Sequence, residues 1–213
     1  MLQNTYKEGM ILKKLSLLFM FLILLIGCSK ITVAKTITDE VTTPKLEIIN
    51  DIKSEMITFH NMSDSMDRGN HELSDEVVVV NTKIEKSKIT RGSVVLFKNT
   101  DGENVITRIL GVPKEEINVQ DGQVYINSKA LDTFYGKVHR LGYSQEEYFE
   151  SMDENKISYN KDEVEKLFKQ NIKKITLGKN EFFVSGDDWL RSDQKKIKTG
   201  DIIGIVIGYK NKN

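Results

Sequence analysis

Serine hydroxyls are the candidate nucleophiles of this chain, and Ser65 lies in a short polar segment at 64–67. A serine attacks a carbonyl only when a base removes its proton and hydrogen-bond donors stabilise the oxyanion that forms. Because serine is common in loops, Ser65 by itself would indicate nothing. Its meaning depends on whether the rest of the chain supplies a base and donors. The three histidines, His60, His71 and His139, are scattered and predict no metal site.

Three segments carry more specific sequence patterns than a lone serine. They read RGSVVLF at 91–97, VITRILGVP at 105–113 and FFVSGDD at 182–188. Together with Ser65-Met66, their order and spacing resemble those of the type I signal peptidases. These are membrane-anchored serine/lysine proteases that remove signal peptides from secreted proteins. The resemblance covers roughly residues 56–135 and 175–209.

In that family the residue directly before the arginine of the second segment is the catalytic lysine, and here it is Thr107. Thr107 follows Ser65 by 42 residues, a separation that fits the family's spacing between nucleophile and base. A lysine acts as a base because burial in an apolar pocket lowers its pKa towards neutrality. Threonine has no accessible pKa. The resemblance therefore implies that Ser65 and Thr107 face each other and that the dyad is broken.

The same resemblance implies roles for residues around the dyad. It places a contribution to the oxyanion hole at Ser63, substrate-groove packing at Met66, the partner of the family's lysine at Ser192, and a turn-holding contact at Asp187 and Arg108. Other positions depart from the pattern. The family's proline and threonine after the Ser-Met dipeptide are replaced by an unrelated segment at 67–73, and the expected aspartate and arginine are Gln194 and Lys196.

The N-terminus has the pattern of a secretory signal. Lys13 and Lys14 precede an uncharged apolar run at 15–27 that ends at Cys28, the single cysteine. The Leu-Ile-Gly-Cys ending resembles a bacterial lipobox, whose cysteine is lipidated and becomes the first mature residue. We therefore expect residues 1–28 to be a signal peptide with a lipobox; the alternative is an uncleaved membrane anchor. Residues 29–55 are expected to be a spacer that holds the domain on the extracytoplasmic face of the membrane.

Residues 56–213 are expected to form a mainly β, signal-peptidase-like antiparallel domain. The predicted strands lie at 56–62, 77–80, 93–98, 105–110, 118–130 (a meander), 181–185 and 201–208. A helical insert at 144–174 interrupts them. Its first helix should be capped by Ser144 with Glu147, and its second by Asn160 or Asp162. Helical spacing in the second helix predicts one face packed on the sheet, formed by Val164, Leu167, Phe168 and Ile172.

Three functions remain open from the sequence. The first is a catalytically inactive, chaperone-like homologue that binds secreted protein segments and assists pilus assembly, with a pilin segment and sortase-linked machinery as partners. The second is an active signal peptidase with a non-standard base, and the third is a lipoprotein scaffold for an unrelated ligand. Charge is balanced, with 31 basic and 31 acidic residues, so we expect no nucleic-acid partner. No cofactor or metal is expected.

The lipobox gives the first testable prediction. Mass spectrometry of the membrane-extracted protein should find a diacylglyceryl group on Cys28 as the mature N-terminal residue, and Cys28→Ala should release or mislocalise the protein. A mature protein that retains residues 15–27 would contradict lipidation and favour the uncleaved anchor.

Overall fold

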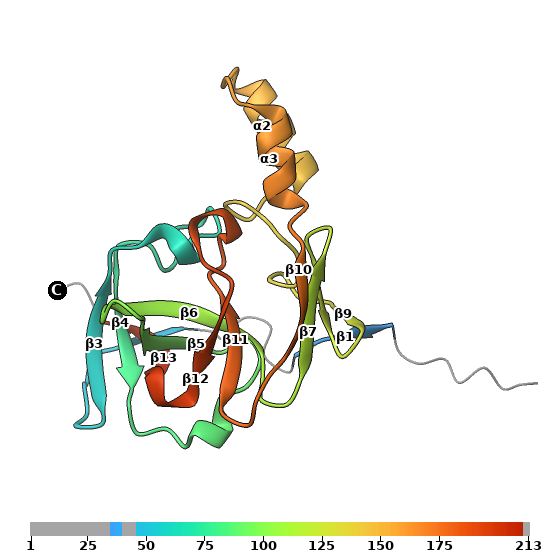
Figure 1. Ribbon diagram of the computed structural model, residues 1–213. Helices are drawn as coiled ribbons and strands as arrows, with labels where there is room; N and C mark the ends of the chain where they lie inside the picture. The colour runs from blue at the N-terminus through green and yellow to red at the C-terminus, as the bar shows by residue number, and fades with distance from the viewer. Residues whose placement is uncertain (1–34, 40–45, 211–213) are drawn as a thin grey trace, which may run out of the picture. The chain divides into compact units, whose positions relative to one another are not determined.

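The computed structural model describes residues 35–39 and 46–210, whose strands form two sheets (Figure 1). The larger sheet has the order β12-β11-β6-β5-β13-β4-β3, with β2 paired to β13. Its strands are β2 (Glu47–Ile49), β3 (Met56–Asn61), β4 (Glu76–Asn81), β5 (Val94–Lys98), β6 (Asn104–Gly111), β11 (Glu181–Ser185), β12 (Lys195–Lys198) and β13 (Ile202–Lys210). All neighbours are antiparallel except β2 and β13. The expected mainly β, antiparallel fold is confirmed.

The smaller sheet lies beside the larger one and has the order β1-β9-β8-β7-β10. Its strands are β1 (Thr36–Ile37), β7 (Glu116–Gln120), β8 (Gln123–Ile126), β9 (Lys129–Leu131) and β10 (Ile172–Thr176). β7, β8 and β9 are the predicted meander. Its apolar face packs with Phe183 of β11 and with Trp189 in one buried cluster, so the two sheets share a core.

The β5–β6 hairpin is the centre of the larger sheet, and its sequence explains why. Every β5 residue from Val94 to Phe97 is buried, as is every β6 residue from Ile106 to Gly111. Runs of β-branched and apolar residues of this kind are typical of strands covered on both faces. The hairpin register places Val95 opposite Thr107. Thr107 therefore lies within the continuously buried stretch of β6 from Ile106 to Gly111.

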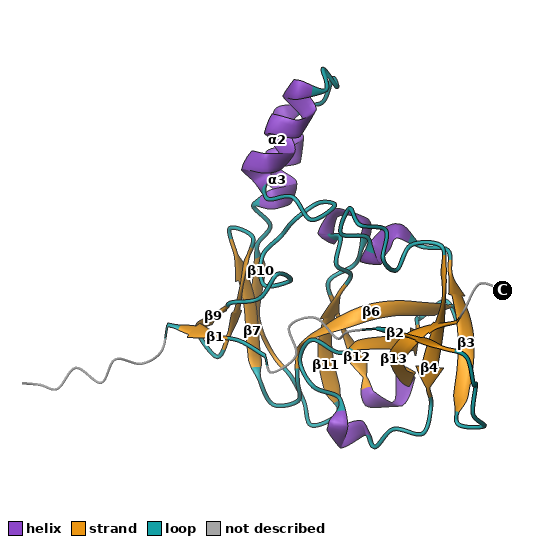
Figure 2. Ribbon diagram, turned by 180° about the vertical axis from the view of Figure 1, so that it is seen from behind, coloured by secondary structure: helices purple, strands orange, loops and turns teal. Residues whose placement is uncertain are grey.

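The described residues also include four short 3₁₀ helices. They are η1 (Asp64–Met66), η2 (Lys86–Lys88), η3 (Trp189–Arg191) and η4 (Thr199–Asp201). η1 follows β3 and η3 follows β11, and the two lie in contact at the same end of the sheet (Figures 1 and 2). The segments that carry Ser65 and Asp187 are therefore neighbours in space.

The insert contains two helices, α2 (Gln145–Glu154) and α3 (Lys161–Phe168). Ser144 and Glu147 form the predicted capping box, and Asn160 caps α3. The prediction that Ile172 lies on this helix is wrong. α3 ends at Phe168, and Ile172 begins β10, where it pairs with the meander.

The expected packing of a helix face on the sheet holds only at the base of α3. Phe168 is buried and Val164 packs against the shared core, whereas Leu167 is 43% exposed. Both figures show the α2–α3 hairpin projecting beyond the smaller sheet. Aromatic contacts from Phe149 to Tyr159 and Phe168 hold the two helices to each other. Each helix has one buried residue, Phe149 in α2 and Phe168 in α3, so most of the hairpin surface is exposed or half-buried.

Part of the expected spacer at 29–55 pairs with the domain. β1 lies parallel to β9, and β2 lies parallel to the last strand, β13. These strands are short and carry little periodicity, so local sequence did not predict them. Residues 1–28, including Cys28, lie outside the described part of the chain. Within that part, no helix is long and apolar enough to cross a bilayer.

The close approach of β13 to β4 gives a stability prediction. A Cβ atom built on Gly204 would lie 2.3 Å from the backbone oxygen of Asn81, whereas one on Gly200 would meet nothing within 4 Å. Gly204→Ala should therefore lower the free energy of unfolding by about 1–3 kcal/mol, as overpacking does. Gly200→Ala should leave it unchanged or slightly raised. Chemical denaturation of both variants measures the difference, and equal stabilities would contradict the packing described for β13.

Candidate functional site

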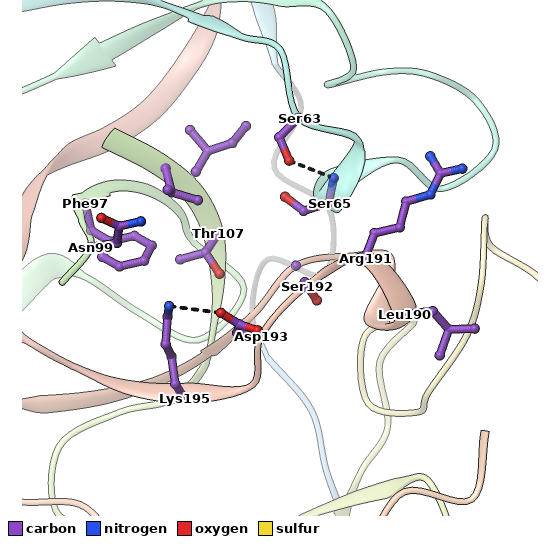
Figure 3. A pocket seen from close by; sticks show the side chains of 13 residues that line it. Ser63, Ser65, Phe97, Asn99, Thr107, Leu190, Arg191, Ser192, Asp193 and Lys195 are labelled. Carbon is purple, nitrogen blue, oxygen red and sulfur yellow. Dashed lines mark hydrogen bonds and ion pairs between the residues drawn. The ribbon is translucent and has the colours of Figure 1, made fainter. Parts of the chain in front are cut away.

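A cavity of about 410 Å³ opens between η1, the β5–β6 hairpin and the turn from β11 to β12 (Figure 3). Its lining combines apolar side chains with hydroxyl and charged groups. The lining residues are Ser63, Ser65, Phe97, Asn99, Val105, Ile106, Thr107, Gly186, Leu190, Arg191, Ser192, Asp193 and Lys195. Four of the residues to which the sequence assigned site roles, Ser63, Ser65, Thr107 and Ser192, therefore meet at one place.

Ser65 is held by contacts of its own backbone. Its N–H donates to Ser63 Oγ at 3.2 Å, which caps η1, and its carbonyl accepts from the Asp188 N–H at 2.9 Å. A Cβ on Gly186 would lie 2.3 Å from the same carbonyl oxygen, so only glycine fits there. The Gly-Asp-Asp segment therefore positions η1 directly.

Thr107 reaches the same cavity from β6. Figure 3 shows its side chain and that of Ser65 on facing walls, as the sequence register predicts. Thr107 is 4% exposed and Ser65 is 7% exposed. Ser65 Oγ is buried and has no hydrogen-bond partner among the described residues. Among the described residues, no basic side chain is hydrogen-bonded to Ser65 Oγ.

The two lysines near Thr107 in sequence, Lys98 and Lys114, do not line the cavity and so do not supply an amine beside Ser65. Lys195 does line it, from β12. Its Nζ lies 3.3 Å from Asp193 Oδ2 and its side chain is 38% exposed. A base of the serine/lysine type needs a desolvated, neutral amine. Lys195 is instead solvated and ion-paired.

Ser63 and Ser192, the groups expected to support catalysis, both make local hydrogen bonds. Ser63 Oγ accepts the Ser65 N–H, and its own hydroxyl can still donate. Ser192 Oγ lies 3.3 Å from both Ser185 Oγ and Gln194 Nε2. Gln194 also donates to the carbonyls of Ser192 and Trp189. Gln194 therefore stabilises the β11–β12 turn where the resemblance implies an aspartate.

Arg108 and Asp187 form a buried bidentate ion pair behind the cavity. Arg108 Nε and Nη2 each donate to Asp187 at 2.6 Å, and Nη1 donates to the Gly92 carbonyl at 2.7 Å. Burial alone lowers the pKa of the guanidinium, but the charge and hydrogen bonds of Asp187 outweigh it and raise that pKa overall. The pair joins β6 to the segment that holds η1.

Two neighbouring groups have pKa values shifted by burial. The Asp188 carboxyl has a raised pKa, because its desolvation outweighs the nearby charges of Arg140 and Arg191. His139 has a lowered pKa for the same primary reason, so its ring favours the neutral form. Neither residue lines the cavity. Both help to hold the walls of the cavity. The backbone N–H of Trp189 donates to the His139 carbonyl, and the backbone N–H of Asp188 donates to the Ser65 carbonyl.

The structure differs from the sequence expectation at Met66. Its side chain is 1% exposed and packs in the core with Leu73, Val80 and Leu96, and it does not line the cavity. The reason is the geometry of η1, which turns Ser65 and Met66 in different directions. Met66 is therefore a core residue and not part of the groove surface.

The segment at 67–73 that replaces the family's proline-threonine loop is also ordered by a buried side chain. Asp67 is 2% exposed and accepts hydrogen bonds from the N–H groups of Gly69 and His71 and from the His71 ring. Gly69 adopts φ +82°, which favours glycine. The loop has therefore gained its own internal stabilisation.

Sequence reasoning missed the charged residues of the cavity, Arg191, Asp193 and Lys195. No strand was predicted over β12, because its sequence, Lys-Lys-Ile-Lys, has a single apolar residue. The available signal was the position of Lys195 two residues before Ile197, since alternate residues of a strand share a face. Within the described ranges, no group of three or more His, Cys, Asp or Glu residues is placed to hold a metal ion.

Comparison with known proteins identifies the family. A family model described as signal peptidase, peptidase S26, matches residues 48–206, most of the chain. The chain belongs to this family. The matched range includes both Ser65 and Asp187.

Matches to individual relatives cover less of the chain than the family model does. The chain is 31% identical over 71 residues to a probable signal peptidase I-2 of Synechocystis sp., an alignment that covers 30% of this chain and 33% of the relative. The chain thus spans about a third of the length of that curated relative. A crystal structure of a signal peptidase I from Enterococcus faecalis V583 is 22% identical, with a TM-score of 0.38, and the match covers 56% of this chain and 97% of that one.

The Arg108–Asp187 pair gives the prediction for the site. Removing one charge of a buried pair leaves the other unpaired and costs about 3–5 kcal/mol. Asp187→Asn should therefore lower the free energy of unfolding by that order, measured by chemical denaturation. Asp193→Asn, at a carboxylate whose side chain is 83% exposed, is the matched control and should change stability by less than about 0.5 kcal/mol. Equal effects would show that the pair does not hold the site.

Proposed function

We propose that this signal peptidase homologue is a membrane-tethered, extracytoplasmic protein that binds an extended segment of a secreted protein without cleaving it. In this proposal the bound segment belongs to a pilin, and the protein assists pilus assembly as a chaperone-like factor. The observation that carries the proposal is the unpartnered Ser65 hydroxyl facing Thr107 across the cavity.

The absence of a base argues against turnover. General acid–base groups typically contribute about 10²–10⁴ in rate, and more where base and nucleophile act as a unit. Thr107 cannot take a proton at neutral pH. The Ser65 N–H, a candidate oxyanion donor, already bonds to Ser63. Both requirements for serine chemistry are thus weakened.

The retained architecture argues for binding. Gly186, the Asp188 N–H and the Arg108–Asp187 pair all hold the walls of the cavity, although the base is missing. A cavity beside a strand hairpin can receive an extended chain, with backbone hydrogen bonds for affinity and the pocket for a side chain. Binding demands shape and donors, whereas cleavage also demands a base.

The proposed pilin partner and the proposed membrane attachment are inferred from the sequence. The lipobox-like ending at Cys28 supports attachment to the outer face of the membrane, and the broken dyad matches the signal-peptidase-like proteins found beside sortase-built pili. Neighbouring pilin and sortase genes would support this partner. Absence of such genes would contradict a pilin as the partner and leave the proposal of peptide binding in place.

A second candidate, an active peptidase with a non-standard base, is favoured by one observation. Of the described lysines, Lys195 alone lines the cavity. For Lys195 to serve as the base, its ion pair with Asp193 would have to open and its amine would have to lose its proton. The test below includes it for that reason.

The proposal predicts that cleavage and biological function separate. Full-length protein in detergent should release no product from a signal-peptide substrate analysed by mass spectrometry, and Ser65→Ala should support pilus polymerisation in cells as the unchanged protein does. Val105→Trp, which places a bulky ring at a partly exposed cavity position of β6, should abolish polymerisation.

Controls separate the alternatives. Thermal unfolding must show that Val105→Trp remains folded, and membrane fractionation must show that each variant is correctly localised. Product formation that disappears in both Ser65→Ala and Lys195→Met would contradict the proposal and establish the second candidate, with Lys195 as base.

A further inference from the structure

Lys195 places a cation in the cavity because of the register of β12. Lys195 and Ile197 share one face of the strand, and Ile197 is buried in the core. The Lys195 Nζ lies 5.8 Å from the centre of the Phe97 ring, which also lines the cavity. Lys196, on the opposite face, pairs with Glu181 instead. The cavity thus receives one of two adjacent lysines.

The partner of Lys195 is easily displaced. Asp193 is 83% exposed, and its ion pair with Lys195 spans 3.3 Å. Exposed pairs of this kind contribute little, because water solvates both charges and the side chains lose freedom. Asp193 can therefore return to solvent when another carboxylate reaches Lys195.

The second cation of the lining is committed elsewhere. Arg191 Nη1 donates to Asp64 at 2.8 Å, and its Nε lies 3.8 Å from Asp188. Arg191 thus has two acidic neighbours, of which Asp188 is shared with Arg140 at 2.7 Å, whereas the pair described for Lys195 is with the exposed Asp193. Lys195 is the cation whose positive charge remains available to a bound group.

Hydroxyl groups supply further donors on the facing walls. Ser65, Thr107 and Ser192 all line the cavity, and Figure 3 shows Ser65 on the far side of it from Lys195. Ser65 Oγ lacks a partner among the described residues. A small apolar side chain in the cavity would leave the Ser65 hydroxyl without a partner, whereas a carboxylate would accept a hydrogen bond from it.

We propose that the cavity recognises a carboxylate of the bound segment, which replaces Asp193 as the partner of Lys195. This inference rests on the proposed binding function and gives its specificity. The carboxylate comes either from a glutamate or aspartate side chain or from the free C-terminus of a chain. Lys195 is accordingly a specificity-determining residue, with Asp193 as its internal competitor.

Fluorescence anisotropy with the full-length protein in detergent tests the proposal. The probes are labelled peptides of one extended host sequence, in which glutamate, glutamine or lysine is moved through each position, made with free or amidated C-termini. At one position, or at the free C-terminus, the carboxylate should bind about tenfold more tightly than its neutral counterpart, as charge-assisted hydrogen bonds allow. The position that responds identifies the source of the carboxylate.

Variants of the charged pair make the test specific. Lys195→Met should remove the preference, and Lys195→Glu should reverse it in favour of lysine peptides. Asp193→Asn should tighten binding of the acidic peptide, because the competitor is gone. Lys196→Met, one residue away on the other face, is the matched control and should bind as the unchanged protein does. Thermal unfolding verifies that each variant is folded.

The outcomes separate this inference from the function on which it rests. Equal binding of acidic, neutral and amidated peptides, unchanged in Lys195→Met, would overturn the carboxylate specificity and leave peptide binding established. Failure of every peptide to bind the unchanged protein would overturn the binding function itself, and the specificity with it.

Discussion

The structure around the cavity depends on the buried pair of Arg108 and Asp187. Arg108 lies in the central hairpin and Asp187 lies in the turn after β11, so the pair joins segments 79 residues apart. Both side chains are nearly inaccessible, and all the bonds described for Arg108 are made to Asp187 and the Gly92 carbonyl. A buried pair of this kind is tolerated only with complete hydrogen bonding, so a displacement that breaks these bonds would cost stability. The turn after β11 is therefore held in one position relative to β6.

This one constraint fixes the rest of the site. The held turn presents Gly186 against the Ser65 carbonyl and the Asp188 N–H to the same oxygen. η1 is therefore positioned through its backbone, whatever the side chain at 65 does. The same turn leads into Ser192 and β12, which bring Asp193 and Lys195 to the cavity. None of these contacts involves the Thr107 side chain, so they hold the turn and η1 in place independently of the residue at position 107.

Threonine at position 107 brings no charge to the cavity. A lysine at 107 would stand beside Arg108 in the strand and would need an apolar, desolvated surrounding to become neutral. Threonine removes that requirement, so the cavity can be polar and hydrated. Lys195, solvated and ion-paired, is compatible with such a cavity as a binding group and unsuited to the role of a neutral amine. Thr107 and an exposed, ion-paired Lys195 are thus physically consistent with one another.

Much of the fold was predictable because its signals are local. The valine run of β4, the Asp-Gly turn before β6, the meander and the Ser144–Glu147 capping box each depend on residues adjacent in the chain. The meeting of Ser65 with Thr107 was predictable for another reason, since a family's motifs preserve strand register. Both kinds of prediction depend on short segments whose local structure is specified by adjacent residues.

By itself, the sequence determined the strand order of the central hairpin and the family's segments. Only the tertiary structure decided the remaining features, because each depends on contacts between distant segments. β2 is a strand because β13 offers it an edge, and Ile172 leaves the helical pattern because β7 pairs with it. Met66 is a core residue because η1 turns it inward. Lys195 lines the cavity because pairing with β11 sets which face of a lysine-rich strand points inward.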